Sequence, residues 1–401
     1  MAMTHFKLGN PLLTLYLALA TVAAYSLPFL RVAPNRLLSG EPVYVWQVFQ
    51  MQDSLIGVAW AWGLIGFLCI ATWMPLQRSI QAMVVVAISI SLAGMWQLGG
   101  QHASLISQTE GTLSRTSLGA AFWSLGAIGW LIALDAINRL QLKNLWRLLI
   151  QSALLMPLIL TLAVSLPLAS GENADQQLSI VKEYVNQSDV LWAATLRHLQ
   201  IVLLAILPAV VLGITLAWRM MQHQGLQKVF FPVLNVIQTI PSIALFGLLM
   251  APLAWIAVQM PAMARAGISG VGIAPAVIAL MLYALLPIVH STLAGFGQVP
   301  AEVIHAARAM GMSTWQLLWQ IELPLALPVL IFGLRTAVVQ TTGLAAVSAL
   351  VGAGGLGQIM FDGLFSAANE LVILGVIPIV LLAMFADTFF KVIEAFIKER
   401  P

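Results

Sequence analysis

Charged residues are scarce in this sequence. Of its 401 residues, 8% are charged and 60% are hydrophobic, whereas about 25% of the residues of an ordinary soluble domain are charged. So few charges cannot cover a surface that faces water. The composition therefore excludes an ordinary soluble domain, and the bilayer must be the solvent for most of the chain.

Cysteine is almost absent as well. The single cysteine, Cys69, lies in an apolar run, so neither a disulfide framework nor a cysteine metal cluster is available. The six histidines form no HExxH or other metal-binding spacing; His198 and His290 lie near expected helix ends, and we interpret both as interfacial. We expect no metal site, no catalytic residues and no nucleic-acid partner.

Long apolar runs recur along the chain. The first, Pro11 to Leu30, has the roughly 20 residues needed to cross about 30 Å of hydrocarbon, and it lacks the shorter apolar region and cleavage site of a signal peptide. We interpret it as an uncleaved first span. The pattern predicts an all-α polytopic membrane protein with about ten transmembrane helices. The further candidate spans are 54–74, 79–98, 118–137, 146–169, 199–218, 230–257, 272–293, 325–349 and 370–390.

The positive charges indicate the orientation of these spans. With the N-terminus in the cytoplasm, most of the 18 lysines and arginines fall in cytoplasmic segments. The positive-inside rule then favours a multi-pass protein with the N-terminus and the C-terminus both cytoplasmic, and we expect it in the bacterial inner (cytoplasmic) membrane.

A long polar segment, Gly171 to Val190, divides the chain near residue 190 and would form a periplasmic loop. We predict that residues 1–190 form an N-terminal module of about five spans plus this loop. Residues 191–401 are predicted to form a second module of about five spans, with proline-interrupted helices and one long cytoplasmic loop at 300–324.

Residues 300–324 read PAEVIHAARAMGMSTWQLLWQIELP and are expected to form a helix–turn–helix on the inner membrane surface. Pro300 can occupy the first position of a helix, where its missing N–H costs nothing. Gly311 permits the backbone to leave that helix. Pro324 is expected to end the element before the next span.

A second short helix is predicted within this loop. Ser313 followed by Gln316 matches a capping box, in which the two side chains satisfy the free N–H groups at a helix start. The apolar face of this helix is predicted to consist of Trp315, Leu318 and Trp319.

The loop resembles the EAA loop of importer permeases of the ABC superfamily, in which Glu-Ala-Ala is followed by three residues, a glycine, nine residues and Ile-x-Leu-Pro. His305 stands where the family usually has glutamate, so a salt bridge from that position is in doubt. The resemblance implies a coupling helix that docks into a groove on an ATPase subunit, and a type I ABC importer permease core in the C-terminal half. An ordinary amphipathic interfacial loop is the structural alternative. The matching positions are Ala306, Ala307, Gly311, Ile321, Leu323 and Pro324.

Other segments are similar to permeases of the quaternary-amine branch, which imports glycine betaine, choline, carnitine or related osmoprotectants. These are LNVIQTIPSIALFGLLMAPL (234–253), ALLPIVHSTLAGF (284–296) and GLRTAVVQTTGLAAVSALVGAGGLG (333–357). APNRLLSGEP (33–42) and SRTSLG (114–119) additionally resemble long YehY-type members with extra N-terminal spans. The match is specific over about 195–395 and weak over the first half.

The resemblance also implies partners. ATP would be bound by a separate cytoplasmic ABC ATPase dimer, so this chain needs no cofactor of its own. A periplasmic substrate-binding protein would deliver the solute, and a second permease subunit, either the same chain or a related one, would complete the importer. Membrane lipid would surround the spans.

Polar side chains lie inside two of the predicted spans. Asn235, Gln238 and Ser242 recur at three- and four-residue spacing and so share one helix face, while the neighbouring Pro241 frees backbone carbonyls. Arg335 lies near mid-bilayer, where a charge must face protein or water. We predict that a translocation path is lined by Asn235, Gln238, Ser242, Arg335, Gln340, Thr341 and Thr342. Helix–helix hydrogen bonding, or for Arg335 a pairing with carbonyls or a carboxylate, is the alternative.

A glycine cluster follows the second polar stripe. It lacks the Gly-Lys-Ser/Thr ending of a phosphate-binding loop, so we interpret it as a tight turn with close packing and not as a nucleotide site. The cluster consists of Gly352, Gly354, Gly355 and Gly357.

The function predicted from these features is that of a non-enzymatic permease subunit working by alternating access. An importer for another small solute, such as an amino acid, stays open. An ion- or proton-coupled secondary transporter would need several intramembrane carboxylates, but only Asp135 and Asp387 come near, at cytoplasmic ends of spans. A membrane-embedded enzyme would need a convergent catalytic set, which we do not find in the sequence.

Overall fold

A computed structural model describes residues 10–35, 38, 40–51, 55–73, 77–110, 114–142, 144–154, 178–265 and 267–398. Its contacts divide the chain into two compact units, Met1–Asn186 (unit 1) and Gln187–Pro401 (unit 2). Seven of the described helices are long and apolar enough to cross a membrane. Most of the predicted span at 146–169 lies outside the described residues.

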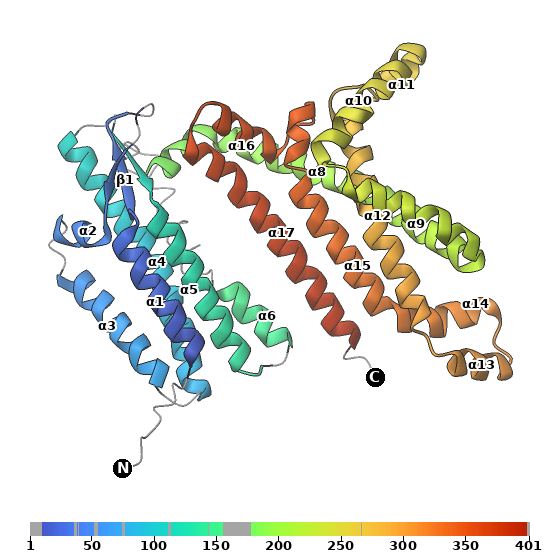
Figure 1. Ribbon diagram of the computed structural model, residues 1–401, viewed down its shortest axis with the longest axis horizontal. Helices are drawn as coiled ribbons and strands as arrows, with labels where there is room; N and C mark the ends of the chain where they lie inside the picture. Colours follow the sequence, from blue (N-terminus) through green and yellow to red (C-terminus); the bar gives the residue numbers. More distant parts are fainter. Residues whose placement is uncertain are drawn as a thin grey trace. The chain divides into compact units, whose positions relative to one another are not determined.

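In unit 1, helices α1, α3, α4 and α5 run side by side (Figure 1). α1 starts at Asn10, whose side-chain oxygen accepts a hydrogen bond from the N–H of Leu13 at 3.1 Å, as an N-cap residue does. Apolar side chains from all four helices form one buried core. The helices of unit 1 are α1 (Pro11–Ser26), α2 (Val45–Met51), α3 (Leu55–Trp73), α4 (Arg78–Glu110), α5 (Ala120–Arg139) and α6 (Asn144–Ala153).

Unit 1 also contains a small antiparallel sheet in the order β2-β1-β3, which the all-helical prediction missed. Leu30 of β1 pairs with a residue on each neighbouring strand. The chain then turns into α5 at Gly119, where a Cβ would lie 2.2 Å from the carbonyl oxygen of Pro28. Only glycine permits this close approach. The strands are β1 (Leu30–Ala33), β2 (Glu41–Val43) and β3 (Arg115–Leu118).

The loop predicted over Gly171 to Val190 is wrong for its second half. From Ser179 onward the chain is helical, as the start of α8 (Ser179–Gln222), whereas residues 171–177 lie outside the described ones. The polar residues of this stretch have protein partners, since Glu183 forms an ion pair with Arg115 at 3.0 Å. Ile180 and Val181 are buried, so the stretch packs as a helix instead of a solvated loop.

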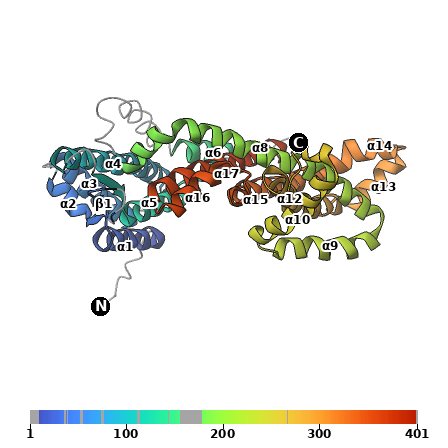
Figure 2. The same ribbon diagram turned by 90° about the horizontal axis from the view of Figure 1, so that it is seen from above.

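In unit 2, α12, α15 and α17 run side by side, with α13 and α14 at one end and α10, α11 and α16 at the other (Figure 1). Figure 2, turned by 90°, shows α13 and α14 together at the edge of the unit. The helices are α9 (Gln224–Thr239), α10 (Ser242–Gln259), α11 (Pro261–Arg265), α12 (Ile273–Gly297), α13 (Ala301–Ala309), α14 (Thr314–Leu317), the π-helix η2 (Leu318–Glu322), α15 (Leu323–Leu344), the 3₁₀-helix η3 (Val347–Val351), α16 (Leu356–Phe365) and α17 (Asn369–Lys398).

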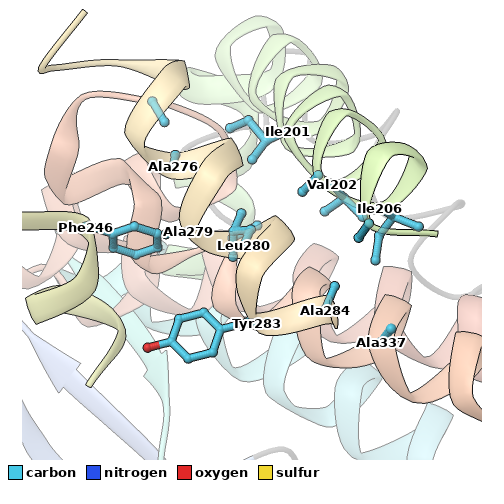
Figure 3. Close-up of a cluster of buried hydrophobic side chains, with 14 of the residues drawn as sticks. Ile201, Val202, Ile206, Phe246, Ala276, Ala279, Leu280, Tyr283, Ala284 and Ala337 are labelled. Atoms are coloured by element: carbon cyan, nitrogen blue, oxygen red, sulfur yellow. The ribbon is translucent and has the colours of Figure 1, made fainter. Parts of the chain in front are cut away.

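The core of unit 2 lies where α8, α10, α12 and α15 meet (Figure 3). Large side chains such as Phe246 and Leu280 fill it, and alanines between them let the helices approach. α12 and α15 come closest: a Cβ on Gly333 would lie 1.8 Å from the Oγ of Ser291, and one on Gly295 would lie 2.9 Å from the carbonyl oxygen of Ala326. Such small-residue contacts are typical of membrane helix pairs, because packing drives their association.

The predicted span at 230–257 is two helices. α9 ends at Thr239 and α10 begins at Ser242, with extended backbone at Ile240 and Pro241. Proline has no N–H to continue the helical hydrogen bonding and disfavours a helical conformation at the residue before it. The break therefore follows from Pro241 itself.

Candidate functional site

Residues 300–324, which we call the coupling segment, lie at one end of unit 2 (Figure 1). α13 follows Pro300, which is the N-cap and not the first helical residue. Glu302 in the first turn and Arg308 in the last place charges that complement the helix dipole. The sequence thus forms a stable helix where the first of the two short helices was predicted.

Gly311 makes the turn between α13 and α14. Its φ is +83°, a left-handed conformation that glycine adopts without steric cost. Its N–H donates to the carbonyl of Arg308 at 3.0 Å, and the N–H of Met312 donates to that of Ala307 at 3.2 Å. No atom lies within 4 Å of a Cβ built on Gly311, so the backbone conformation and not the available space requires glycine here.

The capping box at the start of α14 is confirmed. The N–H of Gln316 donates to Ser313 Oγ at 3.3 Å, and the N–H of Ser313 donates to Gln316 Oε1 at 2.8 Å.

Two residues of the predicted apolar face, Trp315 and Trp319, share one side of the helix and are exposed. The buried side chain is Leu317, with 2% exposed, whereas Trp315 and Trp319 are 67% and 51% exposed. The two tryptophan rings pack edge to face, with centroids 5.4 Å apart. Because the helix continues into α15, its buried side is set by packing on unit 2, and the large rings remain available to a membrane surface or a partner.

Pro324 does not end the element, contrary to the prediction. Residues from Thr314 to Leu344 form one continuous helical stretch, with the π-turn η2 directly before α15. Within it the N–H of Leu323 donates to the carbonyl of Leu318. An α-helical proline clashes with the carbonyl four residues earlier, and the wider π-turn relieves this contact. Ile321, Leu323 and Pro324 therefore belong to the helix that enters the core.

The residues that match the family motif differ in exposure. Ala307 is fully buried, whereas His305, Ala306 and Gly311 are exposed. Met310, beside Gly311, is 75% exposed. The exposed surface of the coupling segment therefore combines small residues with isolated large apolar side chains, a composition that suits contact with another protein.

Two of the predicted path residues meet at the break between α9 and α10. Gln238 Nε2 donates to the backbone carbonyl of Tyr283 at 2.6 Å, and Gln340 Nε2 donates to Gln238 Oε1 at 3.4 Å. The hydroxyl of Tyr283 donates to the carbonyl of Ile240. The helix break thus gains partners from α12 and α15. Tyr283 was missed, although a tyrosine in an apolar run needs a hydrogen-bond partner for its hydroxyl.

Ser242 does not share a helix face with Asn235 and Gln238, because the break places it at the start of α10. Asn235 is exposed and lies on α9 one turn before Gln238, while Ser242 is half-buried. The single predicted stripe is therefore two groups on two helices.

Arg335 contacts α17, whereas Gln340, which lies on the same helix α15, contacts α9. The Nε of Arg335 lies 3.2 Å from Asp387 Oδ1 and its Nη1 lies 3.8 Å from Glu394 Oε2. Lys391 also pairs with Asp387, at 2.6 Å. Of the two alternatives for Arg335, the structure thus shows pairing with carboxylates.

Thr341 and Thr342 are buried among helices. The Thr342 hydroxyl donates to the carbonyl of Val338 in its own helix at 2.8 Å. Its carbonyl oxygen lies 3.0 Å from Nε2 of His198 on α8. His198 is fully buried inside the protein, and its expected place near a membrane interface stays a prediction. Its position inside the long helix α8 could not be known while residues up to 190 were expected to form a loop.

The glycine cluster forms the predicted tight turn. Gly352 ends η3 and Gly355 precedes α16, both with positive φ. A Cβ on Gly357 would lie 1.8 Å from the carbonyl oxygen of Ala346. Among the described residues, no group of three or more histidine, cysteine or acidic side chains could hold a metal ion.

Comparisons with known proteins agree with this arrangement. The family model "ABC transporter permease YehY, N-terminal domain" matches residues 7–167. The model "Binding-protein-dependent transport system inner membrane component" matches residues 209–399.

Three curated proteins are similar to about half of this chain. The osmoprotectant import permease protein OsmW of Salmonella typhimurium is 37% identical over 203 residues, which are 51% of this chain and 89% of that protein. The glycine betaine/carnitine/choline transport system permease protein OpuCD of Bacillus subtilis is 36% identical over 192 residues, 48% of this chain and 77% of that one. The choline transport system permease protein OpuBD of Bacillus subtilis is 34% identical over 199 residues, which are 49% of this chain and 81% of that protein.

A more distant likeness is to a solved chain of the inward-facing MetNI methionine ABC transporter, at 22% identity and a TM-score of 0.42 over 52% of this chain and 98% of that chain. The extent of the curated matches decides the family. This chain belongs to the inner membrane components of binding-protein-dependent transport systems, the permeases of ABC transporters, and carries a YehY-type N-terminal domain.

Proposed function

We propose that this chain is the translocation subunit of an ATP-driven importer for quaternary-amine osmoprotectants, such as glycine betaine or choline. The names of its relatives, which are permeases for osmoprotectants, glycine betaine, carnitine and choline, support this substrate class. A cytoplasmic ATPase dimer binds ATP, a periplasmic binding protein delivers the solute, and a second permease subunit completes the path.

The proposed mechanism depends on the continuity of the coupling segment with α15. The helical stretch Thr314–Leu344 has 31 residues, about 46 Å at 1.5 Å per residue. A displacement of α14 by the ATPase therefore moves α15, and with it Gln340, which is hydrogen-bonded to Gln238 at the helix break. Alternating access follows if this movement opens and closes the path beside the break.

The orientation belongs to the same proposal. The C-terminal end of α17 lies at the same end of unit 2 as the coupling segment (Figure 1). If that end faces the cytoplasmic ATPase, the C-terminus is cytoplasmic, and the positive-inside rule then places the N-terminus there as well. Residues 1–190 act as the N-terminal module and residues 191–401 as the permease core.

For the path itself, we propose Asn235, Gln238, Ser242 and Gln340. A quaternary ammonium group is positively charged but has no N–H to donate, so aromatic faces attract it without a hydrogen bond, and the ring of Tyr283 lies at the break. The contacts of the other predicted residues, Arg335, Thr341 and Thr342, support a role in holding helices together.

The test is ATPase activity in proteoliposomes that contain this chain with its co-purifying partners. A binding protein loaded with glycine betaine or choline should stimulate hydrolysis, and one loaded with methionine should not. Stimulation by the methionine-loaded protein alone would contradict the substrate class. Uptake driven by an ion gradient, with no co-purifying ATPase, would contradict the importer itself.

A further inference from the structure

Unit 1 contains an apolar cavity of about 270 Å³ between α1, α2, α3, α4 and α5, which is partly open to the surface because Tyr25, Ile65 and Cys69 in its lining are exposed. Of its few polar groups, the Thr21 hydroxyl donates to the carbonyl of Leu17 at 2.8 Å and the Ser91 hydroxyl to that of Ala87 at 2.6 Å, so both are satisfied within their own helices. An apolar cavity of about 150 Å³ is known to stay dry and to bind benzene. This cavity is therefore unsuited to ordered water and large enough for a hydrocarbon ligand.

The cavity is elongated along the helices. Its lining runs from Leu17 to Tyr25 on α1 and from Ile88 to Leu98 on α4, which corresponds to about 12–15 Å at 1.5 Å per residue. Because α4 and α5 qualify as membrane spans, this long direction follows the direction in which lipid chains extend. Its shape suits an extended hydrocarbon chain better than a compact solute.

A second apolar hollow lies on the surface between α3 and α4, and Leu64 lines both it and the cavity. On its α4 side Met83, Val86 and Ile90 are about half exposed. On its α3 side, a Cβ on Gly63 would meet no atom within 4 Å, so α3 is not packed closely there. A bilayer lipid chain that entered this hollow would therefore reach the wall of the cavity.

Stacked aromatic rings lie beside one end of the cavity. Tyr25, which lines it, stacks on Trp46 at 5.9 Å between centroids, and Trp46 stacks on Tyr44 at 4.6 Å. Tyrosine and tryptophan are enriched at the level of the lipid headgroups. This end of the cavity therefore corresponds to the headgroup region and the rest to the acyl-chain region.

We propose that the cavity of unit 1 is a lipid-binding site. One acyl chain of a bilayer phospholipid enters between α3 and α4 and occupies the cavity, with the headgroup beside Tyr25 and Trp46. The proposal is independent of the transported solute.

The first test uses the full-length protein in nanodiscs that contain a phospholipid with a photoactivatable diazirine in its acyl chain. Leu92 and the buried Ile132 line the cavity, while Met83 and Val86 lie on the outer hollow alone. Residue-level mass spectrometry should find crosslinks at both pairs. Crosslinks at the outer pair only would overturn the proposal. Labelling of Ile132 by a small apolar diazirine, but not by the lipid, would also overturn it and indicate a small apolar ligand.

Two variants of α1 provide a matched comparison. Ala24 lines the cavity, whereas Val22 on the same helix is 63% exposed. Ala24→Phe should fill the cavity and abolish lipid crosslinking at Leu92 and Ile132 while leaving Met83 labelled. Val22→Phe should leave all sites labelled. Equal crosslinking at Ile132 in the two variants would contradict the proposal, and if Ala24→Phe does not fold, the wild-type crosslinks decide.

Discussion

The two units pack their helices in different ways. In unit 2 a Cβ on Gly333 would lie 1.8 Å from Ser291 Oγ, whereas in unit 1 a Cβ on Gly129 would meet Ile88 and Leu92 at 3.5 and 3.7 Å, an ordinary contact distance. Unit 2 joins its helices by polar contacts such as that of Arg335 with Asp387, and unit 1 retains a cavity of about 270 Å³. The helices of unit 2 are thus closely packed at these points, while unit 1 has space between its helices.

The largest effect is expected when one methyl group is added to a helical glycine in each unit, which tests directly whether the two units differ in packing. Gly333→Ala should destabilise the protein by about 1–3 kcal/mol, because overpacking forces helices apart. Gly129→Ala should be neutral or stabilise by up to about 1 kcal/mol, since alanine favours a helix and has space there. Thermal unfolding in detergent measures both. Equal losses of stability would show that the two units do not differ in packing.

Substitutions at Gly311 test whether transport requires the turn between α13 and α14 to keep its conformation. Gly311→Val should cost about 1–2 kcal/mol in the left-handed conformation and uncouple ATP hydrolysis from uptake, while the protein still inserts. Gly311→Asn should retain most uptake, because asparagine tolerates positive φ. Uptake in proteoliposomes is the measurement. Full uptake by the valine variant would remove the turn from the mechanism.

Polar contact between helices can be tested by a double-mutant cycle on α15 and α17. Arg335→Gln and Asp387→Asn should each destabilise unit 2, and the double variant should lose less than the sum, with a coupling of about 0.5–1.5 kcal/mol. The side chains are 22% and 31% exposed, so solvent screening keeps the value below that of a fully buried pair. Additive losses in unfolding experiments would mean that the pair contributes nothing.

The smallest expected effect concerns two fully buried histidines, one in each unit. His198 contacts the carbonyl of Thr342 through Nε2, whereas neither ring nitrogen of His102 has a hydrogen-bond partner among the described residues. His198→Leu should therefore cost about 1 kcal/mol, and His102→Leu should be neutral or stabilising, because it removes an unsatisfied buried group. The reverse order in thermal unfolding would contradict this assignment.

The apolar spans and the coupling segment were predictable because their signals are local. A run of about 20 apolar residues, a capping box and a glycine turn each follow from neighbouring residues, and the capping box and the glycine turns occur where predicted. The path residues on α9 were only partly predictable. Pro241 signalled a break, but spacing alone treated Ser242 as part of the same helix.

Contacts between distant segments could not be predicted. The partners of Arg335 lie on α17, and spacing within α15 does not say toward which helix its side chain turns. The sheet of unit 1 was missed because its strands have three or four residues, too few for an alternating pattern to be recognised. The start of α8 was missed because its charged residues suggested solvent, whereas Glu183 is paired with Arg115.

The π-turn before α15 helps to determine the direction in which α13 and α14 point around the axis of α15. Each residue of an α-helix advances the chain by about 100° of rotation and 1.5 Å, and a π-turn holds one residue more than an α-turn. The π-turn therefore accommodates one additional residue within a single turn, whereas one additional residue in α geometry would rotate α13 and α14 by about 100° around the axis of α15. The number of residues between Gly311 and Ile321 thus determines in which direction around α15 the exposed surface of α13 and α14 points.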